Sequence, residues 1–313
     1  MAAVPRRPLG GSGIEVSAFS LGSWQTYERM SREEGVAVLH AARDCGIDFL
    51  EVARYNDQTG RAPIPTGYSE VVFGEVFRQS GWPRDKVTIA NKLWWEFWPR
   101  QTAREELEAS LQRTGLDHFD FVYSDPPPPQ LALEEVVGAV GELIGDGTVR
   151  AWAIVNWPAD RVAEAGRIAR EHGLPPPCAA QLPYNVVSRA WTEGPEMVEA
   201  LRACGAGVVA SYVLAGGALT GKYDEAGKAG RLSGALDAPR VQASLAVVAP
   251  LRVLAAEVGV TPAVLAVAFA LANESVASVL FGATSPEHVR ENIRAVEVEL
   301  SPAQLAQLRA IGS

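Results

Sequence analysis

The fold is decided by residues 119–155, FDFVYSDPPPPQLALEEVVGAVGELIGDGTVRAWAIV. Two short apolar runs, 119–123 and 149–155, flank a segment at 131–145 with a helical pattern. A strand, a helix and a second strand in this order predict a βαβ unit with parallel strands.

The same alternation continues along the whole chain. Apolar runs of strand length occur at 18–21, 48–52, 87–91, 119–123, 149–155, 178–182, 207–211 and 277–280. Helical patterns lie between or after them, at 31–44, 69–79, 101–114, 131–145, 159–171, 194–203, 241–258 and 262–271. Eight such units in a chain of 313 residues indicate a closed barrel rather than an open sheet. We therefore predict an α/β fold, a (β/α)₈ TIM barrel, with residues 1–313 as a single domain.

Local signals mark several helix ends. Ser31, followed by Glu34, predicts an N-cap, and Ser69 predicts the start of the next helix. Glycines that follow helical patterns are expected in the left-handed conformation at Gly46, Gly115, Gly173 and Gly205.

The remaining segments are additions to the barrel. Residues 6–16 predict a short hairpin, and 300–310 predict a final helix capped by Ser301. Two long loops, 56–68 and 212–240, follow strand C-termini, the face on which barrel enzymes carry their chemistry.

Composition excludes some classes of partner. A formal net charge of -9 argues against nucleic acid, because phosphate binding needs concentrated Lys and Arg. No run approaches roughly 18 apolar residues and the N-terminus lacks a signal-peptide core, so no membrane partner is expected. Cys45, Cys178 and Cys204 have no metal-ligand spacing, which favours buried thiols in a reducing cytoplasm.

Four polar residues follow the predicted strands at the catalytic face: Glu51, Tyr55, Lys92 and Asp125. Lys92 ends an apolar run, so it needs a carboxylate partner or a depressed pKa, and either Glu51 or Asp125 is a candidate partner. A tyrosine beside this ammonium would have a lowered pKa and act as a general acid. A purely structural ion pair explains the same pattern equally well.

Several stretches in the same order resemble the aldo-keto reductase family over nearly the whole chain. They are GIDFLEVARY (46–55), GYSEVVFGEVF (67–77), VTIANKLWW (87–95), FDFVYSDPPP (119–128), AQLPYNVVSR (180–189), LAGGALTGKY (214–223) and SVLFGATSPEHVRENI (278–293). Within that family the chain is most similar to the branch containing the potassium-channel β subunits. The resemblance implies a (β/α)₈ barrel, a small-molecule substrate and NADPH lying across the strand C-termini.

The family has a catalytic tetrad of Asp, Tyr, Lys and His. Lys92 matches the lysine, and Glu51 stands at the aspartate position with an extra methylene. Tyr55 is the expected tyrosine, although it lies one residue closer to the acid than in the family. Tyr68 is the weaker alternative. Asp125 stands where the family usually has histidine.

The change from histidine to Asp125 alters the expected chemistry. An ionised carboxylate only accepts hydrogen bonds, so it would repel a developing alkoxide unless it were protonated. Burial and the like charge of Glu51 would favour protonation. Otherwise, Asp125 could accept a proton from the substrate.

The cofactor positions are partly kept. The resemblance assigns Asn156 and Gln181 to the nicotinamide carboxamide, but Val155 replaces a serine. The family's Tyr-Ser-Pro-Leu is Ser211-Tyr212-Val213-Leu214 here, which leaves the stacking residue open. The resemblance assigns the pyrophosphate and the adenosine 2′-phosphate to the remaining positions, which are Gly216, Lys222, Arg231, Gly282, Thr284, His288, Glu291 and Asn292.

Residues 282–285 open a predicted helix, whose free N–H groups suit a phosphate, although a plain strand-to-helix turn explains them too. Trp24, Trp94 and Trp157 are predicted to line the substrate pocket, and packing over the barrel mouth is an equally fair explanation. No cluster of His, Cys and carboxylates has metal-ligand spacing.

The sequence leaves three functions open. The first is an NADPH-dependent oxidoreductase that reduces a carbonyl or polarised alkene, with Tyr55 as proton donor. The second is a lyase, dehydratase or isomerase on the same barrel, using Asp125 and Glu51 as acid and base with the cofactor absent or recycled. The third, from the resemblance alone, is a non-catalytic cofactor-binding subunit. The oligomeric state is left open.

Overall fold

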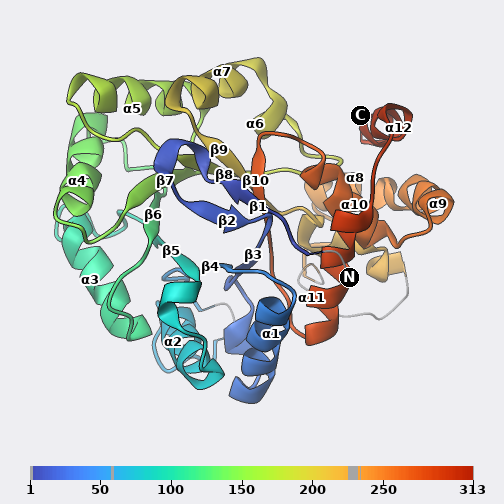
Figure 1. Cartoon of the computed structure of the whole chain (residues 1–313), viewed down its shortest axis with the longest axis horizontal. Coiled ribbons are helices and arrows are strands. Elements are labelled where there is room, and N and C mark those ends of the chain that lie inside the picture. Colours follow the sequence, from blue (N-terminus) through green and yellow to red (C-terminus); the bar gives the residue numbers. More distant parts are fainter. Residues whose placement is uncertain (1–2, 58–59, 225–231, 233, 313) are drawn as a thin grey trace.

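Eight parallel strands close into a barrel in this computed structural model, which describes residues 3–57, 60–224, 232 and 234–312 (Figure 1). Their order around the barrel is β10-β3-β4-β5-β6-β7-β8-β9. The bounds are β3 (Phe19–Gly22), β4 (Phe49–Glu51), β5 (Thr88–Leu93), β6 (Phe121–Ser124), β7 (Ala151–Val155), β8 (Ala179–Pro183), β9 (Gly207–Ser211) and β10 (Val276–Phe281). The predicted TIM barrel is confirmed.

Helices surround the strands as an outer ring (Figure 1). They are α1 (Arg32–Asp44), α2 (Tyr68–Ser80), α3 (Ala103–Thr114), α4 (Leu133–Gly145), α5 (Ala159–Glu171), α6 (Ala190–Glu193), α7 (Pro195–Cys204), α8 (Pro239–Ala246), α9 (Val248–Val258), α10 (Pro262–Leu271), α11 (Pro286–Ile293) and α12 (Pro302–Ile311). The helical pattern at 241–258 therefore covers most of two helices, and a short α6 precedes the helix predicted at 194–203.

The helix starts agree with the sequence at Ser31 and Ser301, which both form capping boxes, and differ at Ser69. Ser31 forms a capping box with Glu34 at the start of α1, as predicted. The prediction that Ser69 caps α2 is wrong, because α2 begins at Tyr68 after Gly67 in the left-handed conformation. The Ser69 hydroxyl instead donates to the carbonyl of Ala53 at 2.7 Å. Left-handed backbone is confirmed at all four predicted glycines, Gly46, Gly115, Gly173 and Gly205.

An N-terminal hairpin closes one end of the barrel. Its strands β1 (Arg6–Pro8) and β2 (Glu15–Ser17) pair antiparallel and lie across the barrel in Figure 1. Leu9, Ile14 and Val16 from the hairpin are buried in one cluster with barrel-interior residues such as Phe49 and Phe121. The predicted hairpin therefore forms the apolar floor of the barrel.

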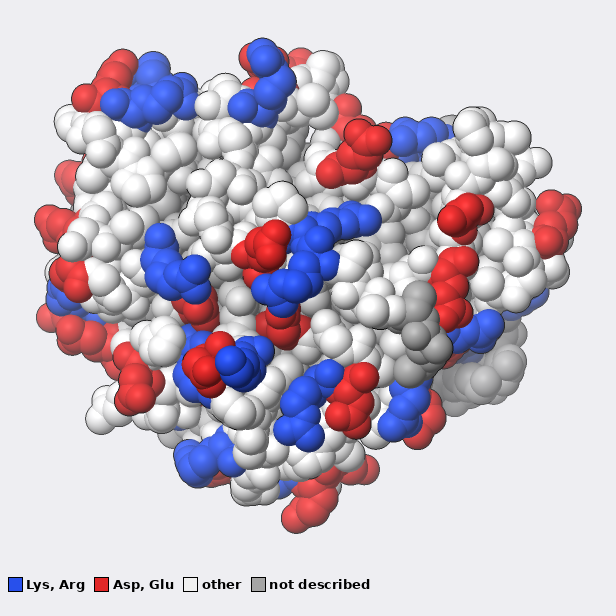
Figure 2. All heavy atoms as spheres, viewed as in Figure 1, with Lys and Arg blue, Asp and Glu red and all other residues white. Residues whose placement is uncertain are grey.

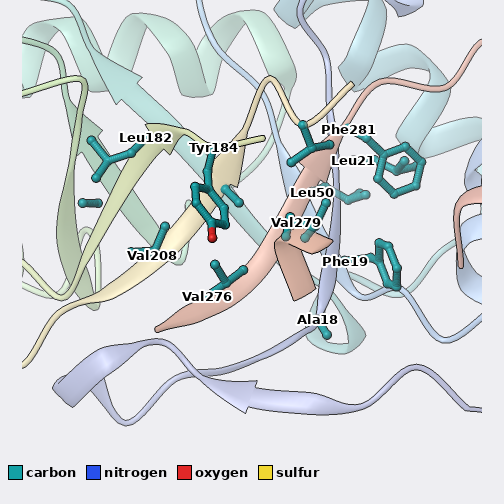
Figure 3. Packing of buried hydrophobic residues seen from close by; sticks show 14 of the residues in the cluster. Ala18, Phe19, Leu21, Leu50, Leu182, Tyr184, Val208, Val276, Val279 and Phe281 are labelled. Carbon is teal, nitrogen blue, oxygen red and sulfur yellow. The ribbon is translucent and has the colours of Figure 1, made fainter. Parts of the chain in front are cut away.

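Strand alternation separates the two cores. Phe19 on β3 and Phe281 on β10 belong to the larger cluster that includes the helices, and their rings meet edge to face at 5.9 Å (Figure 3). Phe49 on β4 and Ala90 on β5 belong to the interior cluster instead. Since side chains alternate along a strand, residues two positions further on point into the same interior. Glu51 is two positions after Phe49 and Lys92 is two positions after Ala90, so both side chains point into the barrel interior.

One stretch has the composition of a membrane span. Pro239–Val258 passes a test of length and hydropathy alone, and it is the one stretch among the described residues that does so. It folds as α8 and α9, with Leu251 and Leu254 buried in the main core. Core helices of soluble proteins pass the same test, so this is weak support for membrane insertion.

Charges of both signs are interleaved on the face shown in Figure 2. Asp120, which precedes β6, accepts from Arg84 at 2.8 Å and from Arg150 at 3.2 Å. These pairs link the N-terminal ends of neighbouring barrel units.

We predict opposite effects from two glycine-to-alanine substitutions. A Cβ at Gly74 on α2 would lie 1.9 Å from the Thr114 carbonyl oxygen, whereas a Cβ at Gly138 on α4 would meet nothing within 4 Å. Gly74→Ala should lower the free energy of unfolding by about 2–3 kcal/mol through overpacking. Gly138→Ala should raise it by roughly 0.5–1 kcal/mol through helix propensity. Urea unfolding measures both, and equal effects would contradict the close contact of α2 with the end of α3.

Candidate functional site

A buried ion pair lies at the C-terminal end of the barrel interior. Lys92 from β5 is 5% exposed and Glu51 from β4 is 1% exposed, and their side chains form a salt bridge. The phenol of Tyr55 donates to Glu51 Oε1 at 2.7 Å and accepts from Lys92 Nζ at 2.7 Å. Of the two partners left open by the sequence, the structure therefore pairs Lys92 with Glu51.

Tyr55 lies four residues after Glu51, the last residue of β4. The two side chains bond to each other directly. The backbone of Tyr55 is held by α2, where Ser69 Oγ accepts from its N–H at 3.4 Å. Tyr68 does not join the pair, and its hydroxyl accepts from Arg32 at 3.4 Å.

The pKa of Tyr55 moves in the direction opposite to the one predicted. Burial raises the pKa of the Tyr55 phenol well above 10, and the charge and hydrogen bond of Glu51 raise it further. The sequence predicted a lowering by Lys92, whereas burial and the Glu51 carboxylate raise this pKa. The phenol therefore keeps its proton at neutral pH.

Asp125 follows β6, and its backbone N–H donates to the Leu93 carbonyl at 2.9 Å. Burial raises the pKa of its carboxyl to about 6, opposed by the charge of Lys92 and assisted by that of Glu106. The sequence predicted the raised pKa correctly but named Glu51 as the repelling charge. Within the described residues the Asp125 carboxyl makes no hydrogen bond or ion pair.

Trp94 forms a wall beside the ion pair. Its ring meets the Tyr55 ring edge to face at 5.6 Å, and Lys92 Nζ lies 5.9 Å from its centroid. The Trp94 indole N–H is buried and has no hydrogen-bond partner among the described residues. The Trp94 indole N–H is therefore an unsatisfied hydrogen-bond donor within the described part of the chain.

The other predicted pocket tryptophans differ in exposure. Trp24 follows β3 and is 40% exposed. Trp157 follows β7, is 1% exposed and packs edge-on against Trp152 at 6.4 Å. Trp157 therefore lies within the main core, and its predicted contact with substrate remains untested.

A buried arginine joins the loops after β4 and β5, and sequence reasoning missed it. Arg54 is 4% exposed and donates to Thr66 and Glu96, both at 2.8 Å. It also lies 3.8 Å from Glu106, which accepts from the Trp94 N–H at 2.9 Å. An arginine in a predicted loop carries no sequence signal of burial, because its partners come from distant segments.

Tyr123 was missed as well. It is fully buried in the interior cluster and pairs with Lys92 in strand register. Its hydroxyl has no partner among the described residues, and burial together with Glu51 raises its pKa. A neutral phenol therefore lies next to the charged pair within the barrel.

Gln181, in the middle of β8, has an acceptor without a hydrogen bond to any described residue. It is 5% exposed, and its Oε1 has no hydrogen-bond partner in the described part of the chain. Asn156 lies beside it in the left-handed conformation and donates its backbone N–H to the Gln181 carbonyl at 3.1 Å. Val155 is buried next to them. An amide N–H donor would satisfy this site.

The loop after β9 has a left-handed backbone at several positions. They include Tyr212, Ala215, Gly216 and Gly217. Asn185 holds this loop, since its side-chain amide donates to the Tyr212 carbonyl at 3.0 Å. Sequence reasoning did not single out Asn185.

Two cations lie along the same loop. Arg240 from α8 stacks over the Tyr212 ring at 4.9 Å, and Lys222 lies so close to Gly217 that a Cβ there would be 2.9 Å from its side chain. Ser211 and Leu214 are partly exposed in this loop. Arg231 lies outside the described residues.

The segment after β10 forms a capped helix start. Ser285 accepts from the His288 N–H at 3.4 Å, and Thr284 Oγ1 lies 3.3 Å from His288 Nδ1. Glu291 accepts from Thr261 at 3.0 Å. Gly282 is exposed and Asn292 is 5% exposed. Among the described residues no group of three or more His, Cys, Asp or Glu could hold a metal ion.

Comparison with known proteins gives one family. A sequence profile of the Aldo/keto reductase family matches residues 18–313. A putative voltage-gated potassium channel subunit beta of Schizosaccharomyces pombe is 33% identical, over 98% of this chain and 93% of its own. Probable voltage-gated potassium channel subunits beta of Oryza sativa and Arabidopsis thaliana are each 31% identical, over 97% and 93% of this chain and 95% and 90% of theirs.

We predict that Asp125 makes stability depend on pH. Its carboxyl has a pKa of about 6 when folded against an ordinary 3.8, so between these values the folded chain binds a proton that the unfolded chain has lost. The stabilising contribution is therefore complete below pH about 4 and is lost as the pH rises through about 6.

The difference in unfolding free energy between the wild type and Asp125→Asn should accordingly fall over this window and be flat above pH about 7. Urea unfolding at a series of pH values measures it. A difference that does not change with pH would mean that the carboxyl ionises as it does in the unfolded chain.

Proposed function

Because the chain belongs to the aldo/keto reductase family, we propose that it is an NADPH-dependent oxidoreductase that reduces a carbonyl or polarised alkene of a small organic substrate. The observation that carries the proposal is the phenol of Tyr55, which contacts both Lys92 and Glu51 at the open end of the barrel. Family members are typically NAD(P)H-dependent oxidoreductases, and these three residues fit that chemistry.

Several residues suit a nicotinamide dinucleotide. The unpartnered Oε1 of Gln181 would accept from the carboxamide N–H. The backbone at Gly216 and Gly217 would approach the pyrophosphate, with Lys222 beside it, and the start of α11 would receive the 2′-phosphate. Val155 stands where the family has a serine, and its side chain cannot make the hydrogen bond that the serine would make. When bound, the cofactor supplies the hydride.

The three interior residues divide the proton chemistry. The Tyr55 phenol is protonated at neutral pH, and its hydroxyl is the proton donor. Lys92 donates to the same oxygen and stabilises negative charge that develops there on proton transfer. Glu51 keeps the ammonium paired inside the barrel.

A lyase, dehydratase or isomerase is the second candidate, and one observation favours it. Burial raises the pKa of Asp125 to about 6, which suits a general base near neutral pH. In that reaction Asp125 and Glu51 would move the protons, with the cofactor absent or recycled.

We also propose a cytoplasmic location, which the three free, buried cysteines support.

We predict that NADPH quenches the tryptophan fluorescence of the purified protein saturably, with a Kd of about micromolar order and tighter than that of NADH. Lys222→Met should weaken binding about tenfold by removing a charge from the phosphates. Lys86→Met, which removes a lysine from the opposite end of the barrel, is the matched control. Binding of neither nucleotide would refute the reductase proposal and favour acid–base chemistry without a cofactor.

We predict that Tyr55→Phe lowers kcat for carbonyl reduction by about 10²–10⁴-fold while the Kd for NADPH stays unchanged. Tyr68→Phe is the matched control, because its hydroxyl contacts Arg32 rather than the ion pair. Steady-state kinetics with aromatic aldehydes measures the effect. Equal activity of Tyr55→Phe and the wild type would exclude Tyr55 as the proton donor.

A further inference from the structure

The substrate end of the site has an unbalanced negative charge. Lys92 is already bound to Glu51 and Tyr55, so its charge is largely compensated. Asp125 is half-buried at the end of β6, where its backbone N–H bonds to Leu93, and its carboxyl has no hydrogen-bond or ion-pair partner among the described residues. Lys92 favours ionisation of this carboxyl and Glu106 disfavours it. Glu28 acts on Tyr55 in the same sense.

The nearby arginine does not restore neutrality. Arg54 is bonded to Glu96 and lies against Glu106, so its charge is shared between two carboxylates. The aromatic side chains add to the preference for positive charge, since the face of a tryptophan attracts cations. Trp94 lies beside Tyr55, and Trp24 is exposed on the loop after β3.

Such surroundings discriminate between hydride acceptors. Hydride addition to a carbonyl builds negative charge on oxygen, which an ionised Asp125 opposes. Hydride addition to an iminium ion removes positive charge, so a carboxylate stabilises the bound cation and no oxyanion develops. The carboxylate therefore favours binding and protonation of an imine, whereas it opposes the oxyanion that develops when a carbonyl is reduced.

We propose that this site reduces imines, bound as iminium cations against Asp125. The proposal rests on the hydride-transfer function proposed above and goes beyond it to a C=N substrate. Asp125 is the counter-ion of the substrate nitrogen, and the indole of Trp94 forms the adjoining wall.

The reaction balances with the groups named. The imine nitrogen takes the proton of the Asp125 carboxyl, or arrives already protonated, which gives an iminium–carboxylate pair. A C–H bond forms with hydride from the reduced nicotinamide, and the C=N π electrons move to nitrogen. The products are a neutral amine and the oxidised nicotinamide, and water returns a proton to Asp125.

Binding without turnover is the first test. Calorimetry would compare N,N-dimethyl-1,2,3,4-tetrahydroisoquinolinium, a permanent cation, with its neutral carbocyclic analogue tetralin. The wild type should bind the cation at least tenfold more tightly than tetralin, and Asp125→Asn should lose most of this preference. Asp117→Asn, which removes an exposed carboxylate at the N-terminal end of β6, is the matched control and should keep the preference.

Turnover is the second test. The wild type should reduce 1-methyl-3,4-dihydroisoquinoline with a kcat/KM at least tenfold higher than that for 1-tetralone, and Asp125→His should reverse this order. Asp125→Asn should lower kcat/KM for 1-methyl-3,4-dihydroisoquinoline. It should lower kcat/KM for the permanently charged N-methyl-3,4-dihydroisoquinolinium by the same factor, since the carboxylate acts as a counter-ion and this cation needs no proton transfer.

Efficient reduction of 1-tetralone with no preference for either cation would overturn the imine proposal and leave the reductase function intact. Failure to bind NADPH would instead refute the reductase function on which it rests. Equal binding of cation and tetralin by the wild type would overturn the role of Asp125 as a counter-ion.

Discussion

An ammonium inside a protein barrel needs a counter-ion, and the pairing of Lys92 with Glu51 meets this requirement. The pair is enclosed by the apolar floor on one side and by the loops on the other. Tyr55 contacts both members, so its protonation depends on the balance between them. Removal of either charge would leave the other uncompensated in a low-dielectric interior.

The fold was accessible from the sequence because each barrel unit is local. A strand such as β6 and a helix such as α4 each carry their own period of apolar residues, and glycines such as Gly115 mark where helices end. The start of α2 was not accessible in this way. Ser69 has the side chain of an N-cap, but it bonds to Ala53 on another segment, and tertiary contacts of this kind leave no mark in the local pattern.

The candidate site was predicted in part for the same reason. Lys92 and Glu51 follow apolar runs, and their place at the barrel mouth follows from strand parity. The sequence predicted that Lys92 lowers the pKa of Tyr55, whereas burial raises it, because the depth at which the phenol lies depends on tertiary packing. Arg54 and Asn185 were missed, since each holds loops that are far apart in sequence. Asp125 was identified, whereas Glu106, which acts on it, became visible only in three dimensions.

The N-terminal hairpin closes one end of the barrel and leaves the loops after the strands at the other end. Leu9, Ile14 and Val16 fill that end with apolar side chains, so traffic of solvent and small molecules to the charged layer runs through the loops after the strands. A small molecule that reaches this interior therefore enters and leaves at the same end of the barrel. The apolar floor and the loops thus lie at opposite ends of the barrel, with the ion pair of Lys92 and Glu51 between them.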